Sequence, residues 1–186
     1  MTAGIGHNSG RVDEPGRAFR KFAWGKARAQ LLPKLPIEVV RRRVLRAKEL
    51  GLPYKTYAGL RASSGDDLIG FLFSSNALGV LKAGQGVDPS RADKVITLRD
   101  ARTFGLAHAP ITPEAMCPPL QAAAKAPRAL APWSETRDVL QQAFAAQKLP
   151  SSRTVLICET ELELEWLSAA RMAGAIRADQ FFAASP

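Results

Sequence analysis

The sequence predicts an α/β protein: a small open sheet with flanking helices, preceded by a basic helical N-terminal region. Apolar runs of strand length, at 67–73 and 153–158, are each followed by residues typical of a helix N-terminus. The positive charge is confined to one end, because residues 1–60 hold 13 of the 26 Lys and Arg residues but only four of the 17 Asp and Glu residues. Residues 61–186 carry 13 of each sign, which is typical of a neutral globular body.

The N-terminal segments are expected to lack a core of their own. Residues 1–18 are rich in Gly, Ser and Asn, so we expect a mobile leader. Its segment "GIGHNSG" resembles a short N-terminal stretch of many small alphaproteobacterial and phage-borne proteins, several of them DNA-associated, which implies an origin in a phage or mobile element. Residues 19–35 interleave aromatic side chains with cations. They can stack on bases and hold phosphates, or dock as a short helix on the body, and docking is favoured.

A helix is expected from Pro36 to about Leu50. Proline suits the first turn of a helix, Glu38 complements the positive helix N-terminus, and apolar residues recur on one side at helical spacing. Gly51 is a natural C-terminal residue and Pro53 cannot continue the helix, so the two predict its end.

The stretch around this end resembles a bacterial helix-turn-helix. Ala47 precedes Gly51 by four residues, a leucine flanks this glycine on each side, and Tyr57 and Leu60 supply the apolar positions of a second helix. The alternative is a helix pair that only packs, because Gly59 costs a helix about 1 kcal/mol relative to alanine.

If the pair binds DNA, the start of the second helix faces base edges and the arginines lie near phosphates. Residues 19–65 then form one basic helical region with a helix-turn-helix. The candidate nucleic-acid-binding residues are Arg41, Arg42, Arg43, Arg46, Tyr54, Lys55, Thr56 and Arg61.

The body, residues 66–186, alternates strand and helix patterns. Thr160 and Glu163 form a capping box that favours a C-terminal helix. The segment 110–132 holds six of the 13 prolines among alanines and is expected to be a linker or extended wrap. Strands are predicted at 67–73, 94–98 and 153–158, and helices at 75–83, 99–104, 134–147 and from Thr160 onward.

Acidic residues beside two predicted strands support the alternative hypothesis of a metal-dependent nuclease or phosphotransfer enzyme, with Asp67 and Glu159 as its candidate catalytic residues. Asp66 and Glu161 lie next to them, and carboxylates of this type hold Mg²⁺ beside a phosphate. The stretch "ETELELE" lacks the lysine that several nuclease families carry, and two parallel strands would place the two pairs at opposite edges of the sheet. Helix capping and solvated surface explain the same acids.

No other catalytic motif occurs in the sequence, and neither a cofactor nor a metal is predicted. G-x-S-x-G, the P-loop and the dinucleotide fingerprint are absent. His7 and His108 are interpreted as surface or loop histidines. Cys158 lies in an apolar strand and is expected to be buried and inert, whereas Cys117 is expected to be an exposed but unactivated thiol. The sparse cysteines favour a reducing cytoplasm, and the longest apolar run is far short of the ~20 residues that span a membrane.

The sequence therefore predicts a non-enzymatic nucleic-acid-binding protein of accessory or regulatory role, cytoplasmic and with DNA as the expected ligand. The concentration of cations in one region carries this prediction, because such a region gains affinity for phosphate backbones by releasing counterions. A homodimer or a protein partner is compatible with it, and no membrane is expected. Two alternatives stay open, namely the metal-dependent enzyme and a protein-interaction module or inhibitor that binds an acidic partner.

Overall fold

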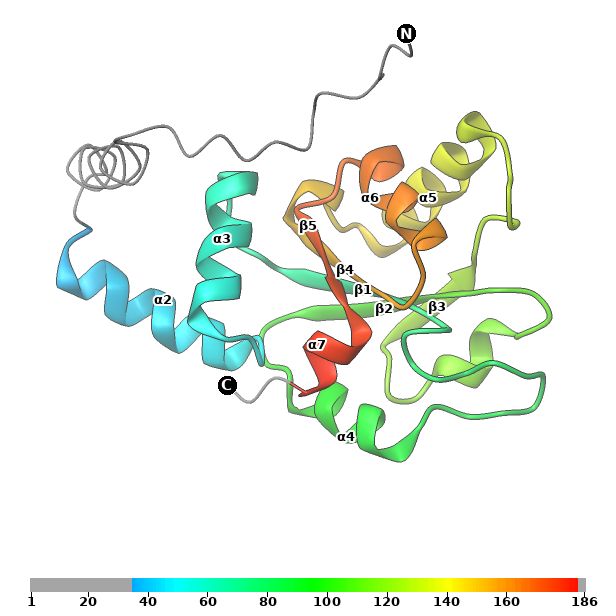
Figure 1. Cartoon of the computed structure of the whole chain (residues 1–186), viewed down its shortest axis with the longest axis horizontal. Helices are drawn as coiled ribbons and strands as arrows, with labels where there is room; N and C mark the ends of the chain where they lie inside the picture. Colours follow the sequence, from blue (N-terminus) through cyan, green and yellow to red (C-terminus); the bar gives the residue numbers. More distant parts are fainter. Residues whose placement is uncertain (1–34, 184–186) are drawn as a thin grey trace, which may run out of the picture. The chain divides into compact units, whose positions relative to one another are not determined.

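The computed structural model describes residues 35–183 and shows an open sheet of five parallel strands with helices on both faces (Figure 1). The order across the sheet is β3-β2-β1-β4-β5. This confirms the predicted α/β class, while the predictions for 1–18 and 19–34 lie outside the described residues. The strands are β1 (Gly70–Ser74), β2 (Arg102–Ala107), β3 (Ala122–Lys125), β4 (Thr154–Cys158) and β5 (Gly174–Arg177).

The helices connect the strands, and residues 41–183 belong to one compact unit. No helix within residues 35–183 has both the length and the apolar character to cross a membrane. The α-helices are α2 (Ile37–Glu49), α3 (Tyr54–Ser64), α4 (Pro89–Thr97), α5 (Trp133–Gln147), α6 (Glu165–Ala170) and α7 (Ala178–Ala183), and the 3₁₀ helices are η1 (Pro113–Met116), η2 (Ser151–Arg153) and η3 (Leu162–Leu164).

Separate apolar clusters cover the two faces of the sheet. Side chains alternate along a strand, so Phe71 and Phe73 of β1 face the cluster that includes α4 and α7, whereas Leu72 faces α5 and α6 (Figure 1). All residues of β1 and β4 are buried. Strands buried on both faces carry continuous apolar runs, which is why these two were evident in the sequence.

The helix pair α2–α3 has the predicted turn. Gly51 adopts a φ of +61°, and the backbone N–H of Leu52 donates to the Ala47 carbonyl at 2.9 Å, which closes the end of α2. Leu50, Leu52 and Tyr57 are buried in the cluster that includes α4 and α7. The apolar pattern of the stretch is therefore accounted for by packing, whichever role the pair performs.

The strand predicted at 94–98 is wrong, because residues up to Thr97 belong to α4. The helix N-terminus decides the element: Asp88 accepts hydrogen bonds from the backbone N–H groups of Ser90 and Arg91, and Pro89 occupies the first turn. These local signals outweigh the strand propensity of the β-branched residues. The helix predicted at 99–104 is wrong for the complementary reason, since β2 runs through its second half and buries residues 103–107.

The helix predicted at 75–83 is replaced by turns. Ser74 Oγ accepts the backbone N–H of Ala77 at 3.0 Å, and Gly79 adopts a φ of +73°, a left-handed conformation that interrupts a helix. Ser75 and Asn76 consequently lie just beyond the end of β1 instead of capping a helix.

The capping box at the start of the C-terminal unit is confirmed. Glu163 Oε2 accepts the backbone N–H of Thr160 at 3.0 Å, and Thr160 Oγ1 accepts that of Glu163 at 3.4 Å. The long helix expected beyond it is wrong, because α6 ends at Ala170, the next residue, Arg171, adopts a φ of +52°, and Gly174 begins β5. Pairing with β4 fixes this strand, and no local pattern announces it. The segment 110–132 likewise contains η1 and the edge strand β3.

Substitution of a buried residue of the sheet should lower stability more than substitution of an exposed residue of a helix. Leu72→Ala removes a fully buried side chain of β1 and should lower the free energy of unfolding by about 2–5 kcal/mol. Ile96→Ala changes a side chain that is 69% exposed on α4 and should stay within about 0.5 kcal/mol of the parent. Urea denaturation followed by circular dichroism measures both, and equal losses would contradict the assigned burial.

Candidate functional site

Half of the predicted nucleic-acid-binding residues are exposed on the helix pair. Arg41 and Arg42 of α2 are exposed and Arg43 is half-buried. At the start of α3, Tyr54 and Lys55 are exposed, and Thr56, which is half-buried, lines a small groove against β5 and α7. Arg46 and Arg61, the remaining two, have a different environment.

Asp67, in the loop before β1, holds both of these arginines. Its carboxylate lies 3.5 Å from Arg46 Nε and 3.2 Å from a terminal nitrogen of Arg61, and it accepts hydrogen bonds from the Tyr57 hydroxyl at 2.7 Å and the Leu68 backbone N–H at 2.9 Å. Burial is the largest cause that raises the pKa of Tyr57, and the hydrogen bond to Asp67 is the second. The hydroxyl therefore keeps its proton and donates. This network ties α3 to the start of the sheet.

Arg46 extends the same network to other loops. Its guanidinium donates to the backbone carbonyls of Leu68 and Asp100, both at 3.0 Å, and pairs with Glu49 at 2.9 Å. The two carbonyls precede β1 and β2, so Arg46 joins α2 to the amino ends of two neighbouring strands. The charge of Arg46 is therefore largely engaged by groups of the protein itself.

The structure does not bring the candidate catalytic carboxylates together. β1 and β4 are parallel and paired from Gly70↔Thr154 onward; Asp67 precedes β1, whereas Glu159 follows β4. The two therefore lie at opposite ends of neighbouring strands. Within residues 35–183, no group of three or more His, Cys, Asp and Glu side chains is arranged to hold a metal ion.

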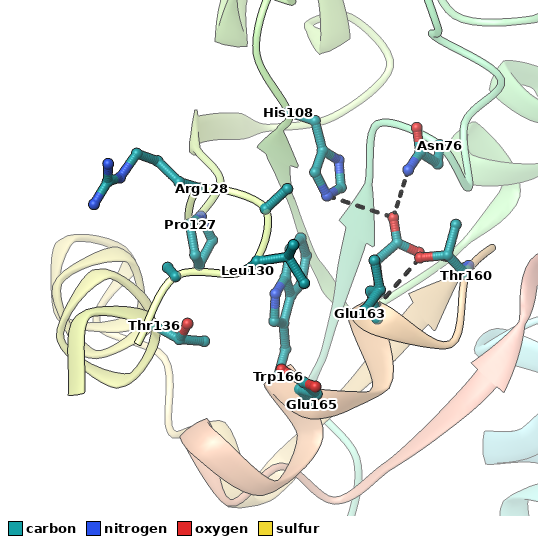
Figure 2. Close-up of a pocket in the computed structure, with 13 residues that line it drawn as sticks. Asn76, His108, Pro127, Arg128, Leu130, Thr136, Thr160, Glu163, Glu165 and Trp166 are labelled. Atoms are coloured by element: carbon teal, nitrogen blue, oxygen red, sulfur yellow. Dashed lines mark hydrogen bonds and ion pairs between the residues drawn. The ribbon is translucent and has the colours of Figure 1, made fainter. Parts of the chain in front are cut away.

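A cavity of about 190 Å³ lies at the carboxyl ends of the strands (Figure 2). Asn76 follows β1, His108 follows β2, and Thr160 and Glu163 follow β4, while residues 127–131 form another side. In open α/β sheets, ligands bind outside the carboxyl ends of the strands, where the strand order changes direction. The order β3-β2-β1-β4-β5 places that point between β1 and β4, and the Asn76–Glu163 hydrogen bond spans it.

Glu163 and His108 form the polar centre of this cavity. Glu163 is 1% exposed, and its Oε1 accepts a hydrogen bond from Asn76 Nδ2 at 2.9 Å and lies 3.7 Å from His108 Nε2 (Figure 2). On its other side, His108 Nδ1 contacts Ser75 Oγ at 3.0 Å, and this oxygen also accepts the His108 backbone N–H. These two contacts with Ser75 orient the imidazole so that Nε2 faces Glu163.

This arrangement favours binding over nucleophilic catalysis. Both ring nitrogens of His108 already face protein groups, and Ser75 is fully buried and does not line the cavity. Burial lowers the pKa of His108, and the nearby Glu163 opposes this shift without reversing it. The imidazole ring stacks on Trp166 at a centroid distance of 5.3 Å, so the cavity joins one aromatic wall to one buried carboxylate.

The sequence offered only indirect signals for this cavity. It identified Glu163 as a capping residue and His108 as a loop histidine, and it assigned Ser75 and Asn76 to a helix start. These residues come from separate segments that meet only in the folded sheet. Cys158, expected to be inert, is buried, and burial raises the pKa of its thiol to about 11. Cys117 is half-buried, and burial raises the pKa of its thiol as well.

Comparison of the chain with protein-family models, with curated proteins and with solved structures found no match. Functional inference therefore rests on the geometry of the helix pair and of the cavity.

The two classes of arginine should differ in their effect on stability. Arg46→Ala removes charge-assisted hydrogen bonds to two loops and the ion pair with Asp67, and should lower the free energy of unfolding by about 1–3 kcal/mol. Arg42→Ala, at an exposed position of the same helix, should change it by less than about 0.5 kcal/mol. Chemical denaturation of both variants measures these changes. An Arg46→Ala variant as stable as the parent would contradict the role of Arg46 in joining α2 to the strands.

His108 should make the protein less stable in mild acid. Because its pKa is lowered in the folded state, its contribution to stability is complete above the unfolded value of about 6.5 and is lost as the pH falls through the folded value. NMR titration should give His108 a midpoint below that value. As the pH falls from about 7.5 to about 5.5, the free energy of unfolding of His108→Gln should decrease less than that of the parent. An equal decrease in both proteins would show that other groups cause the pH dependence.

Proposed function

We propose that this protein binds nucleic acid, with DNA as the first candidate, through the exposed basic face of α2. The observation that carries the proposal is the position of Arg41, Arg42 and Lys48. All three are exposed, and at 3.6 residues per turn they share one side of the helix, while Ala47 and Leu50 point to the core. This side belongs to the part of the chain that holds the excess positive charge.

A helix face of this kind suits the phosphate backbone. Cations that neutralise phosphates release counterions, and this supplies affinity that does not depend on sequence. Lys55 and Tyr54, exposed at the start of α3, are the candidates for contacts with bases. Arg46 and Arg61 act indirectly, because their pairing with Asp67 holds the two helices against the sheet.

A second candidate function is a protein-interaction module that binds an acidic partner. The observation in its favour is Leu45, which is 61% exposed between Arg41 and Lys48 on the same side of α2. An apolar side chain amid cations suits a protein surface better than a phosphate backbone. Both candidates fit an accessory or regulatory role in the cytoplasm. A metal-dependent enzyme built on Asp67 and Glu159 is not favoured, because the two precede and follow neighbouring parallel strands.

Removal of two exposed cations should test the basic face. Arg42→Ala/Lys48→Ala should weaken binding to all DNA duplexes alike and should lower the slope of log K against log salt by up to about 0.9 for each charge. Fluorescence anisotropy with labelled duplexes at several salt concentrations measures both quantities.

The matched control is Lys125→Ala/Arg137→Ala, which removes the same charge from exposed positions of β3 and α5. The control should retain most of the affinity. Equal losses in the two double variants would indicate attraction by net charge alone, and unchanged binding in Arg42→Ala/Lys48→Ala at low salt would overturn the proposal.

A further inference from the structure

We propose that the cavity at the carboxyl ends of the strands binds a small organic cation, a primary ammonium or amidinium group on a compact apolar body. The cation would bind Glu163, and the body would lie against Trp166 (Figure 2). This inference goes beyond nucleic-acid binding and does not depend on it, since the network of Arg46 and Asp67 lies at the opposite ends of the strands.

Glu163 has an acceptor position left for a ligand. Its Oε2 accepts the backbone N–H groups of Glu159 and Thr160, at 2.7 and 3.0 Å. Its Oε1 accepts one hydrogen bond, from Asn76, while His108 Nε2 lies at 3.7 Å, beyond hydrogen-bonding distance. A carboxylate has about four acceptor sites, two on each oxygen. The second site of Oε1 therefore suits a donor entering the cavity.

The charges that line the cavity favour a cation over an anion. Glu165 adds a second carboxylate to that of Glu163, and the one lining arginine, Arg128, is engaged by Glu135 through two hydrogen bonds of 2.8 Å. His108 faces Glu163 but is held in its neutral form by burial at neutral pH. A buried carboxylate is costly without a compensating charge, so it attracts a cation that enters the cavity. A phosphate or carboxylate would meet like charge.

The apolar residues that line the cavity determine which apolar group the ligand can carry next to its cation. Trp166 is 5% exposed and lines the cavity, and since His108 stacks on its ring, an apolar body in the cavity would contact the part of the indole that His108 leaves uncovered. Leu130 and Leu162 also line it, although they are 87% and 55% exposed. The volume of about 190 Å³ exceeds that of an engineered apolar cavity of roughly 150 Å³ that binds benzene. One ring with one amino group fits this space.

Leu130 has an unusual backbone conformation at the rim of the cavity. Its φ is +58°, a left-handed conformation that a bulky side chain rarely adopts. Residues held in such conformations concentrate at ligand-binding positions, where the surrounding structure maintains them. The capping role of Glu163 explains the two bonds of Oε2, but it explains neither the remaining site on Oε1 nor the exposed leucines around the cavity.

Three probes of nearly equal shape test the charge preference: benzylamine, benzyl alcohol and benzoate. At about pH 7.5 they are cationic, neutral and anionic, while His108 is neutral. Titrated into the full chain and followed by NMR, benzylamine should bind saturably and about tenfold more tightly than benzyl alcohol, a difference of about 1.4 kcal/mol. Benzoate should not bind. Equal binding of benzoate and benzylamine, or no saturable binding of benzylamine, would overturn the proposal.

Variants of Glu163 and Glu165, the two acids that line the cavity, show which carboxylate causes the preference for a cation. Glu163→Gln should abolish the preference for benzylamine over benzyl alcohol, whereas Glu165→Gln, at an exposed lining position, should retain most of it. A preserved preference in Glu163→Gln would contradict the assignment. Because Glu163 also caps a helix, the melting temperature of each variant is compared with that of the parent.

A measurement on the unaltered protein does not depend on these variants. Intermolecular nuclear Overhauser effects should connect the benzylamine ring to Trp166 and its methylene group to His108. Contacts to other parts of the surface, with none to Trp166, would place the ligand elsewhere and overturn the proposal. The outcome of DNA binding by the α2 variants bears on neither result.

Discussion

Burial of the sheet on both faces is the constraint on which the rest of this structure depends. Every residue of β1 and β4 is buried, so the central strands have no room for charged groups along their length. Charged side chains gather at the two ends of the strands instead. One end is organised around Asp67 and the other around Glu163, and each carboxylate is surrounded by donors from several segments. Glu163 is buried and requires such donors, whereas Asp67 is only half-buried and is held by its two arginines and the Tyr57 hydroxyl.

At the amino ends, the requirements of Asp67 divide the cations into two groups. Arg46 and Arg61 turn inward and hold α2 and α3 in place, and Arg46 also satisfies the carbonyls of two loops. Arg42 and Lys48 of α2 stay exposed. A basic segment that is uniform in sequence therefore has a structural part and a part available for a partner. Loss of binding in an Arg46 variant would mix these two effects, whereas an Arg42 variant separates them.

At the carboxyl ends, Glu163 serves the fold and the cavity with different oxygens. Oε2 satisfies the backbone where β4 ends, and Oε1 faces Asn76, His108 and the cavity. Negative charge at this end, which also includes Glu165, contrasts with the basic side of α2. The two proposals therefore concern opposite ends of the sheet: a polyanion at the helix pair, and a small cation at the carboxyl ends of the strands.

The sequence by itself determined the α/β class, the strands β1 and β4, the end of α2 at Gly51 and the capping box of Glu163, because apolar periodicity and capping are local. Prediction from the sequence failed at α4, where helix-capping residues and strand-forming residues conflict. It also failed at β5, which is a strand because it pairs with β4. Only the tertiary structure decided which arginines turn inward and which residues line the cavity. Asn76 and Glu163 are 87 positions apart, and the order of the strands, which no local pattern encodes, brings them into contact.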